Sequence, residues 1–325
     1  MESQTKAAET MTCAACDIEC QRFGKHRNRL RRFRCPRCHK TYTQPHRPAL
    51  EGSYVPQERL ALALRLLIEG NSLRSTERIS GLDINTIMKL LVLAGEKCEK
   101  LMGRLLVNIP VRYVECDEIW GFIRKKEGHK RPEEANDETI GDAYCFVAIE
   151  RHSKLVLNFA LGRRNQATTD IFIEGLRNAT APHPFQVTTD GFTPYRSAMA
   201  TTLDDRCDDA QLIKVYRAPA EGQARYSPAE VVSTEVVPVF GRPDPERICT
   251  SHVERQNLTM RMQIRRLTRL TNAFSKRWEN LWAALCLHFA YYNFCRIHRT
   301  LRVTPAMEAG ITDHIWAILE LLETA

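Results

Sequence analysis

Residues 111–118, with the sequence VRYVECDE, give the clearest indication of how this chain folds. The β-branched and aromatic residues of 111–116 predict a strand that ends at Asp117. Glu115 and Glu118 flank that aspartate, but successive side chains of a strand point to opposite faces of the sheet. We therefore expect Asp117 to serve as the functional acid and the two glutamates to support it.

The elements that follow residue 117 alternate between strands and helices. We expect strands at 144–150, 155–161, 185–189 and 211–216, and an amphipathic helix at 168–177. Three antiparallel strands, then a helix, then parallel strands is the order of a ribonuclease-H-like fold. The predicted class is α/β (α+β), with a mixed five-stranded sheet flanked by helices.

Two further carboxylates occupy positions comparable to that of Asp117. Asp190 follows the strand at 185–189, and Glu254 begins a long helix. Mg²⁺ prefers hard oxygen ligands, so carboxylates from separate elements can hold a pair of Mg²⁺ or Mn²⁺ ions. Two such ions would activate the attacking oxygen and stabilise the leaving one in an in-line phosphoryl transfer. We expect Asp117, Asp190 and Glu254 to converge as catalytic residues and metal ligands.

The helix that begins near Glu254 carries candidate supporting residues. Arg261 and Arg265 lie seven and eleven positions further on and return to within about 20° of its face, so they are expected to contact DNA phosphate. Asn257 and His252 are also expected to reach the site. A separate apolar stripe is predicted to dock on the sheet: Val253, Met260, Ile264 and Leu267.

Two Cys-x-x-Cys motifs near the N-terminus predict a metal site. They are Cys13–Cys16 and Cys35–Cys38, separated by eighteen residues. Four thiolates presented by two tight turns suit a tetrahedral structural zinc ion, and short strands between the motifs predict a zinc ribbon with Tyr42 extending the second strand. Cys20 and His39 are alternative ligands that do not share the repeated spacing.

Residues 45–52 are typical of a linker, and three helices are predicted after it. They cover 56–70, 73–79 and 84–94, with N-caps from Asn71-Ser72 and Asp83, and a further helix is predicted at 96–104. A short helix, a turn with glycine and a following helix is a helix-turn-helix arrangement. Three residues early in the last helix are expected to reach base edges: Asn85, Thr86 and Lys89.

Basic residues are concentrated in two parts of the chain. The 325 residues carry a formal net charge of +8, but residues 1–50 have eleven Lys and Arg against four acids, and residues 255–302 have ten against one. Two basic surfaces around an acidic middle suit a polyanion such as nucleic acid, and a pair of solvated basic faces is an equally good explanation. Among the basic residues of the ribbon, Arg29, Arg31 and Arg32 are expected to bind nucleic acid.

The remaining composition excludes several classes of protein. A hydrophobic fraction of 43% can fill a core, and no run approaches the eighteen apolar residues of a membrane span. The chain shows no apolar segment of a secretory signal, so we expect a cytoplasmic protein whose other eight cysteines are reduced and mostly packed in apolar surroundings.

The motifs together resemble the insertion-sequence-1 family of DNA transposases, in a form with one reading frame. The resemblance runs over most of the chain: the double Cys-x-x-Cys, the helix-turn-helix, DEIW (117–120) with the basic RKK (124–126), TDG (189–191), HVERQN (252–257) and YNFCRIHRTL (292–301). It implies an Asp-Asp-Glu triad of Asp117, Asp190 and Glu254, with Arg261 as the basic residue after the glutamate. It also implies terminal-inverted-repeat DNA as substrate, a prokaryotic source and a homo-oligomer on DNA.

The predicted organisation has three parts. They are a zinc ribbon at 1–50, a helix-turn-helix domain at 51–106 and a catalytic domain at 107–325, with a proline-rich segment at about 218–248 that is either an insertion touching DNA or a disordered loop. Three alternatives stay open: a nuclease or domesticated transposase without strand transfer, a DNA-binding regulator with an inactive catalytic domain, and a zinc-ribbon module that binds RNA.

Overall fold

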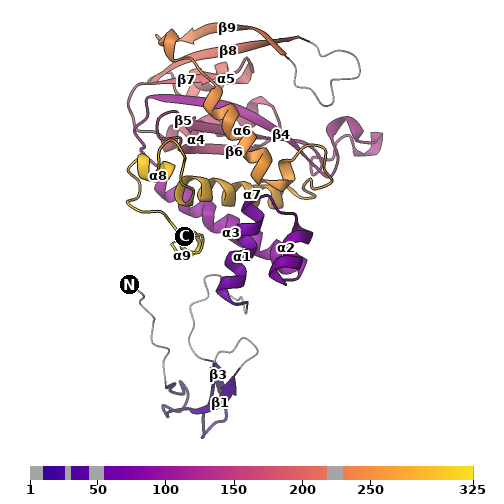
Figure 1. The fold of residues 1–325 in the computed structure, drawn as a ribbon, viewed down its shortest axis with the longest axis vertical. Helices are drawn as coiled ribbons and strands as arrows, with labels where there is room; N and C mark the ends of the chain where they lie inside the picture. Colours follow the sequence, from indigo (N-terminus) through magenta and orange to yellow (C-terminus); the bar gives the residue numbers. More distant parts are fainter. Residues whose placement is uncertain (1–9, 26–30, 44–54, 218–229, 325) are drawn as a thin grey trace. The chain divides into compact units, whose positions relative to one another are not determined.

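The computed structural model describes residues 10–25, 31–43, 55–217 and 230–324. The chain divides into two compact units, Met1–Leu62 and Ala63–Ala325. The first unit contains the cysteine motifs and the second contains a large sheet with its helices (Figure 1).

The first unit holds a small antiparallel sheet in the order β1-β2-β3. Its strands are Gln21–Lys25, Arg31–Arg34 and Thr41–Thr43. Phe33 in the middle strand is 1% exposed and packs with Cys13, Cys20 and Cys35, which is a very small core. Tyr42 does not extend the second strand as predicted, because the turn at 35–38 reverses the chain and places Tyr42 opposite Phe33 in a third strand.

Three helices follow: α1 (Gln57–Ile68), α2 (Leu73–Ser80) and α3 (Ile84–Leu105). Both predicted N-caps are confirmed, since the Ser72 hydroxyl accepts from the backbone N–H of Ser75 at 3.1 Å and the Asp83 carboxylate accepts from that of Asn85 at 2.8 Å. Gly81, with φ of +66°, ends α2 in the left-handed region. The division into helices 84–94 and 96–104 is wrong: Gly95 lies inside one 22-residue helix, where its missing side chain lets Ala283 approach.

The second unit is built on a six-stranded mixed sheet in the order β6-β5-β4-β7-β8-β9 (Figure 1). The strands are β4 (Tyr113–Ile123), β5 (Gly141–Glu150), β6 (Val156–Gly162), β7 (Phe185–Thr189), β8 (Cys207–Arg217) and β9 (Glu230–Phe240). Strands β4, β7 and β8 are parallel to one another and the other three pairings are antiparallel. The sheet has one strand more than predicted, because part of the proline-rich segment pairs with β8 as β9.

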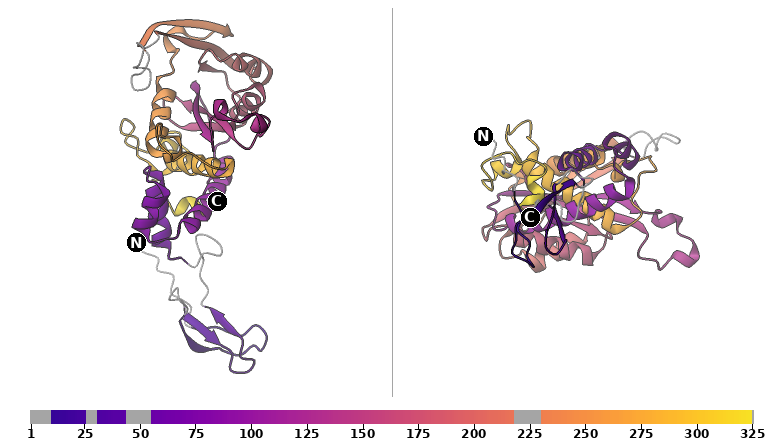
Figure 2. Two further views of the ribbon diagram at one scale, coloured as in Figure 1. Left: turned by 90° about the vertical axis from the view of Figure 1, so that its right-hand side faces the viewer. Right: turned by 90° about the horizontal axis from the view of Figure 1, so that it is seen from below.

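Helices cover both faces of this sheet (Figure 2). Phe146 of β5 packs against Phe172 and Tyr195, which belong to α4 (Gln166–Ala179) and α5 (Pro194–Thr202). Phe159 of β6 lies opposite Val147, hence on the other face, and stacks on Phe289 of α7 (Trp278–Ala290) at 4.5 Å.

Helix α6 (Ser251–Gln263) lies on the same face as α7 and packs on β4 and β5. It ends at Gln263, so Ile264 is its C-cap and Arg265–Leu267 form a separate 3-10 turn. The predicted alignment of Arg265 with Glu254 on one helix face is therefore wrong. The four residues of the predicted apolar stripe are nevertheless all buried: Val253, Met260, Ile264 and Leu267.

The C-terminal segment closes one edge of the sheet. Asn293, in the π-helical turn Tyr291–Cys295 after α7, is fully buried. Its amide donates to the carbonyl of Val156 and accepts from the N–H of the same residue, as a neighbouring strand would. Two short helices follow, α8 (Pro305–Glu308) and α9 (Glu320–Glu323).

Candidate metal centres

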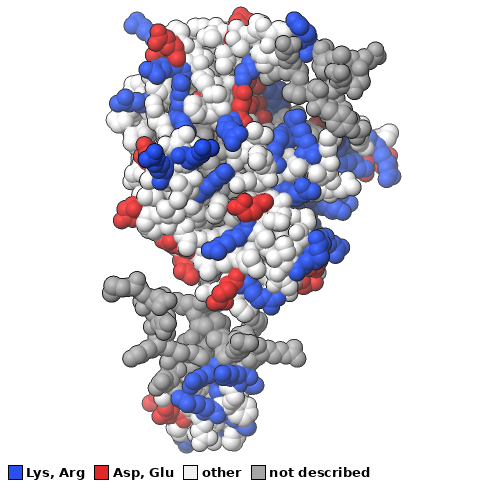
Figure 3. Space-filling model, in the orientation of Figure 1, with Lys and Arg blue, Asp and Glu red and all other residues white. Residues whose placement is uncertain are grey.

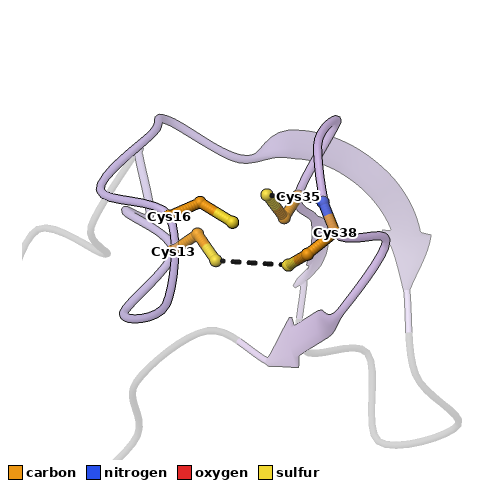
Figure 4. A group of neighbouring side chains, drawn as sticks. All are labelled: Cys13, Cys16, Cys35 and Cys38. Carbon is orange, nitrogen blue, oxygen red and sulfur yellow. Dashed lines mark hydrogen bonds between the residues drawn. The ribbon is translucent and has the colours of Figure 1, made fainter.

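The four cysteines of the two Cys-x-x-Cys motifs converge in the first unit. The sulfurs of Cys13, Cys16, Cys35 and Cys38 all lie within 4.8 Å of one another and point toward a common centre (Figure 4). Cys13 Sγ and Cys38 Sγ are 3.6 Å apart. Tetrahedral Zn–S bonds of about 2.3 Å give sulfur separations of about 3.8 Å, so the spacing fits one zinc ion.

The surroundings of the sulfurs also fit a cation. The Tyr42 hydroxyl lies 3.0 Å from Cys13 Sγ and is the main reason that the pKa of Cys13 is lowered to about 6. The pKa of Cys16 is raised to about 12, first through its hydrogen bond with Cys38. This is expected when neighbouring thiols compete to ionise, because the negative charge of one thiolate makes the next thiol harder to ionise. Cys20 and His39 are not members of the group, so four protein ligands already fill the tetrahedron.

In the second unit, three carboxylate side chains from β4 and from the end of β7 lie close together, and we refer to this cluster as the carboxylate group. One carboxylate oxygen from each of Asp117, Glu118 and Asp190 lies within 4.8 Å of the others. Asp117 does not end its strand as predicted, because β4 continues to Ile123. Strand β7 pairs with β4 only as far as Glu115, so this edge of β4 carries no paired strand from there until Ile123, which forms a bridge with Ser275. Glu118 and Asp117 leave β4 on opposite faces, yet both reach this open edge, and the prediction that Glu118 points away from Asp117 is wrong.

Burial and mutual repulsion make these carboxylates hard to ionise together. The pKa of Asp117 is raised to about 6, first by burial and then by the charges of Asp190 and Glu254. The pKa of Glu118 is raised to about 8, again first by burial and then by Asp190. Glu118 Oε1 is buried and has no hydrogen-bond partner among the described residues. Crowded oxygen ligands with one left unsatisfied fit a divalent cation such as Mg²⁺ or Mn²⁺.

Arg164 spans the carboxylate group and was not predicted. Its guanidinium contacts Glu118 at 3.5 Å and Asp190 at 3.4 Å, and it lies over the Phe192 ring at 4.0 Å. The residue stands just before the N-cap of α4, at the end of β6. No sequence motif marked it, because it follows β6, a strand that β5 separates from β4, and only the assembled sheet brings it to the carboxylate group.

Glu254 lies beside this group without belonging to it. Its charge is one cause of the raised pKa of Asp117. Its carboxylate is held in an ion pair with Lys214 of β8 and accepts a 2.6 Å hydrogen bond from the Thr250 hydroxyl. The structure therefore brings Asp117 and Asp190 together and keeps Glu254 on Lys214.

Helix α6 is positioned by Glu115, the other glutamate beside Asp117. The Glu115 carboxylate is buried and accepts hydrogen bonds from the backbone N–H groups of His252 and Val253 at 2.8 and 3.1 Å. It also bonds the His252 ring at 2.6 Å. Glu115, Cys249 and His252 have metal-ligand spacing, but the carboxylate is already used to cap a helix N-terminus, which favours anions over cations.

Two other predicted residues of α6 have clear partners. The Asn257 amide donates to Asp117 Oδ2 at 2.8 Å, so it does reach the site. Arg261 is directed away from it and donates to the carbonyls of Leu267 and Trp120 at 3.0 and 3.3 Å. Burial lowers the pKa of Arg261 to about 10, and the residue ties the end of α6 to β4.

The comparisons with known proteins found structural likenesses only at a distance. No protein-family model matches the chain, and no curated protein matches it. Among solved structures, the chain is similar to a piggyBac transposase in a synaptic complex with hairpin DNA, with 10% sequence identity and a TM-score of 0.39. The alignment covers 86% of this chain and 73% of that one.

The predicted DNA-binding residues lie in both units. In the first unit, Arg31 and Arg32 are on β2, and the Arg32 guanidinium lies 5.4 Å from the centre of the exposed Phe23 ring; Arg29 lies outside the described residues. In the second unit, Asn85 and Lys89 are exposed on the first turns of α3 and Thr86 is half-buried. Among the described residues, no helix is long and apolar enough to cross a membrane.

Proposed function

We propose that this chain is a DNA transposase of the Asp-Asp-Glu type, which cleaves and joins DNA strands with the help of bound divalent metal ions. The observation that carries the proposal is the group formed by Asp117, Glu118 and Asp190 at the open edge of β4. Buried carboxylates with raised pKa values are costly for a fold and are concentrated at functional sites.

The chemistry assigns a role to each residue. Asp117, Asp190 and Glu254 are the proposed catalytic triad, and Glu118 is added as a fourth oxygen ligand. When bound, two divalent ions would activate the attacking oxygen and stabilise the leaving oxygen. Asn257 holds Asp117 in place through its amide. With the carboxylates neutralised by cations, Arg164 is free to donate to a phosphate oxygen.

The order of the strands supports this proposal. Strands β6-β5-β4 are antiparallel, and β7 and β8 continue the sheet parallel to β4, an order that agrees with the ribonuclease-H-like domain we propose, with β9 added at the edge. In that arrangement Asp117 and Asp190 lie on the two central parallel strands. We propose residues 107–325 as the catalytic domain.

The N-terminal parts supply the DNA-binding half of the proposal. We propose a zinc ribbon at 1–50 and a helix-turn-helix at 51–106, with Arg29, Arg31, Arg32, Asn85, Thr86 and Lys89 on the DNA. The proposed substrate is the terminal inverted repeat of an insertion sequence of the insertion-sequence-1 type, bound by a homo-oligomer in a prokaryotic cytoplasm. The two concentrations of basic residues favour such a polyanionic partner.

The test is metal-dependent cleavage of candidate end DNA by the purified full-length protein. We expect cleavage in Mg²⁺ or Mn²⁺, and a loss of at least about a thousandfold in Asp190→Asn with DNA binding nearly unchanged. Asp204→Asn, an exposed aspartate outside the group, is the matched control and should cleave normally.

Each alternative function gives a different result in this test. Cleavage without joining of pre-cleaved ends would indicate a nuclease or a domesticated protein. DNA binding without any cleavage by the wild type would indicate a regulator. Tighter binding to RNA than to a duplex end of equal length would indicate the RNA-binding module.

A further inference from the structure

A large groove lies in the second unit, outside the carboxylate group. Its volume is about 1210 Å³. It is lined by the last residues of α1, the first residues of α2, the first half of α3, the segment after α6 and one side of α7. Gln263, the last residue of α6, lines it, and Asn257 on the same helix bonds Asp117. Six residues of helix span about 9 Å, so the groove begins close to the carboxylate group.

The groove has a strongly basic rim. Six of its lining residues are Lys or Arg and only Glu96 and Glu279 are acidic: the basic ones are Arg74, Lys89, Arg265, Arg266, Lys276 and Arg277. In the described part of the chain, Lys89, Arg265, Lys276 and Arg277 have no ion-pair partner. Many Lys and Arg side chains lie on the face over α2 and the segment after α6 (Figure 3). Such a rim attracts a chain of negative charges.

One of these cations lies deeper and has no acidic partner either. The Arg266 guanidinium contacts only the Ser275 hydroxyl at 3.4 Å and the Met88 sulfur at 3.5 Å, and burial lowers its pKa to about 10. A half-buried guanidinium without a carboxylate loses part of its hydration, and an anionic ligand would offset that loss.

The floor of the groove, in contrast, is apolar. Side chains from four elements contribute to it: Leu73, Ile84, Met88, Ile264, Phe274 and Leu287. The Phe274 ring is half-buried against Phe122, with the ring centres 4.8 Å apart. A paired duplex presents phosphates and sugars to a protein surface and would leave this floor without a partner. Unpaired nucleotides present both phosphates and flat apolar base faces.

We infer that the groove binds an unpaired DNA strand, with its phosphates on the basic rim and one or more bases on the apolar floor beside Phe274. The inference rests on the proposed function, since it names where that substrate would lie when its strands separate next to the carboxylate group. It gives Asn85 and Lys89 a single-stranded ligand in place of a duplex one.

The experiment measures binding of the full-length protein to three fluorescently labelled oligonucleotides of equal length. They are a single strand, its duplex, and an abasic strand that keeps the phosphates and lacks the bases. Metal ions are omitted so that no cleavage occurs. We expect the single strand to bind at least about tenfold more tightly than the abasic strand, because base stacking contributes about 1–3 kcal/mol per base.

Two variants separate the rim from the floor. Lys276→Ala with Arg277→Ala should weaken single-strand binding by about tenfold and reduce the slope of log affinity against log salt by about 1.4, since each phosphate contact contributes about 0.7. Phe274→Leu, which keeps an apolar side chain near Phe122 but removes the aromatic face, should weaken single-strand binding and leave the salt slope and abasic binding unchanged. Lys100→Ala, an exposed lysine on α3 away from the groove, is the matched control.

The inference is overturned if the abasic strand binds as well as the single strand, or if the groove variants and Lys100→Ala behave alike. Displacement of the strand by an acidic peptide of equal charge would also overturn it, because the floor would then not select bases. If the wild type never cleaves DNA but the groove variants lose strand binding, the groove is supported and the proposed function is rejected. If the wild type cleaves DNA but the groove variants bind the strand normally, the proposed function is supported and the groove is rejected.

Discussion

The cysteine group and the carboxylate group are both candidate metal sites, but they are built in opposite ways. The four cysteines lie within 26 residues, come from two tight turns and already fill a tetrahedron. The carboxylates come from two strands more than seventy residues apart, and a further acid beside them is paired with Lys214. A closed ligand set suits a structural ion, and an open set leaves positions for substrate oxygens.

The largest effect is expected when the closed set is broken. Cys35→Ser should lose the zinc ion and with it the fold of the ribbon, because a structural zinc ion contributes about 10 kcal/mol or more to folding. Zinc content by mass spectrometry should fall from one ion per chain to none. Cys20→Ser, in the same small core but outside the group, should keep its zinc. Zinc retained in Cys35→Ser would contradict the tetrahedral assignment.

The next largest effect concerns Glu118, which the structure adds to the predicted carboxylates. Glu118→Gln should reduce metal-dependent cleavage by about a hundredfold and weaken Mn²⁺ binding, because it removes an oxygen ligand from the group. Glu174→Gln, an exposed glutamate on α4, is the control. If Glu118→Gln binds Mn²⁺ and cleaves like the wild type, Glu118 is only a neighbour of the site.

A buried carboxylate outside both groups sharpens the comparison. Asp209 is fully buried, neither of its carboxylate oxygens has a partner among the described residues, and burial raises its pKa to about 7 despite nearby Arg196. Because Asp209 is harder to ionise in the folded state, the folded state is favoured at pH values below the pKa of an unfolded aspartate, near 4. That stability is lost as the pH rises through the folded pKa of about 7. Asp209→Asn should therefore gain stability relative to the wild type by up to about 4 kcal/mol between pH 4 and pH 8.

Urea unfolding of metal-free protein at the two pH values measures this difference. Asp204→Asn, at an exposed position on the same segment, should show no such pH dependence. Equal gains for Asp209→Asn at pH 4 and pH 8 would show that folding does not raise the pKa of Asp209.

The smallest effect concerns Glu254, which lies beside the carboxylate group and is paired with Lys214. Lys214→Met frees Glu254 from its ion pair, so Mn²⁺ affinity should rise by up to about fivefold, in keeping with the small free energy of a partly exposed pair. Titration calorimetry measures it. A fall in affinity would show that Lys214 supports the metal site instead of competing with it.

The sequence predicted the parts of the fold that are set locally. Each Cys-x-x-Cys turn and the caps at Ser72 and Asp83 depend on neighbours within a few residues, and the repeated spacing identified the two turns as partners. Helix α5 was missed although Pro194 stands at its first position, which is a recognised start signal. Strand β9 was missed because its valines are interrupted by polar residues within a proline-rich segment, and its pairing with β8 is a long-range contact.

The candidate site was predicted in part for the same reason. Asp117 and Asp190 were predicted from their places in or directly after strands, but Glu118 was left out because side chains on opposite faces of a strand were expected to lie apart, whereas their oxygens approach one another at the edge of β4 that β7 leaves uncovered. Arg164 reaches the group from a third element, and the ion pair of Glu254 with Lys214 joins residues forty positions apart. Such contacts depend on how the sheet is assembled.

The hydrogen bonds from α6 to Glu115 also have a consequence for how such a chain can change over time. The helix that carries Glu254 and Asn257 is anchored to β4 at Glu115, two residues from Asp117. Residues can be gained or lost between β8 and β9 while the acids keep their spacing. A change in the length of that connection therefore need not move Asn257 relative to Asp117.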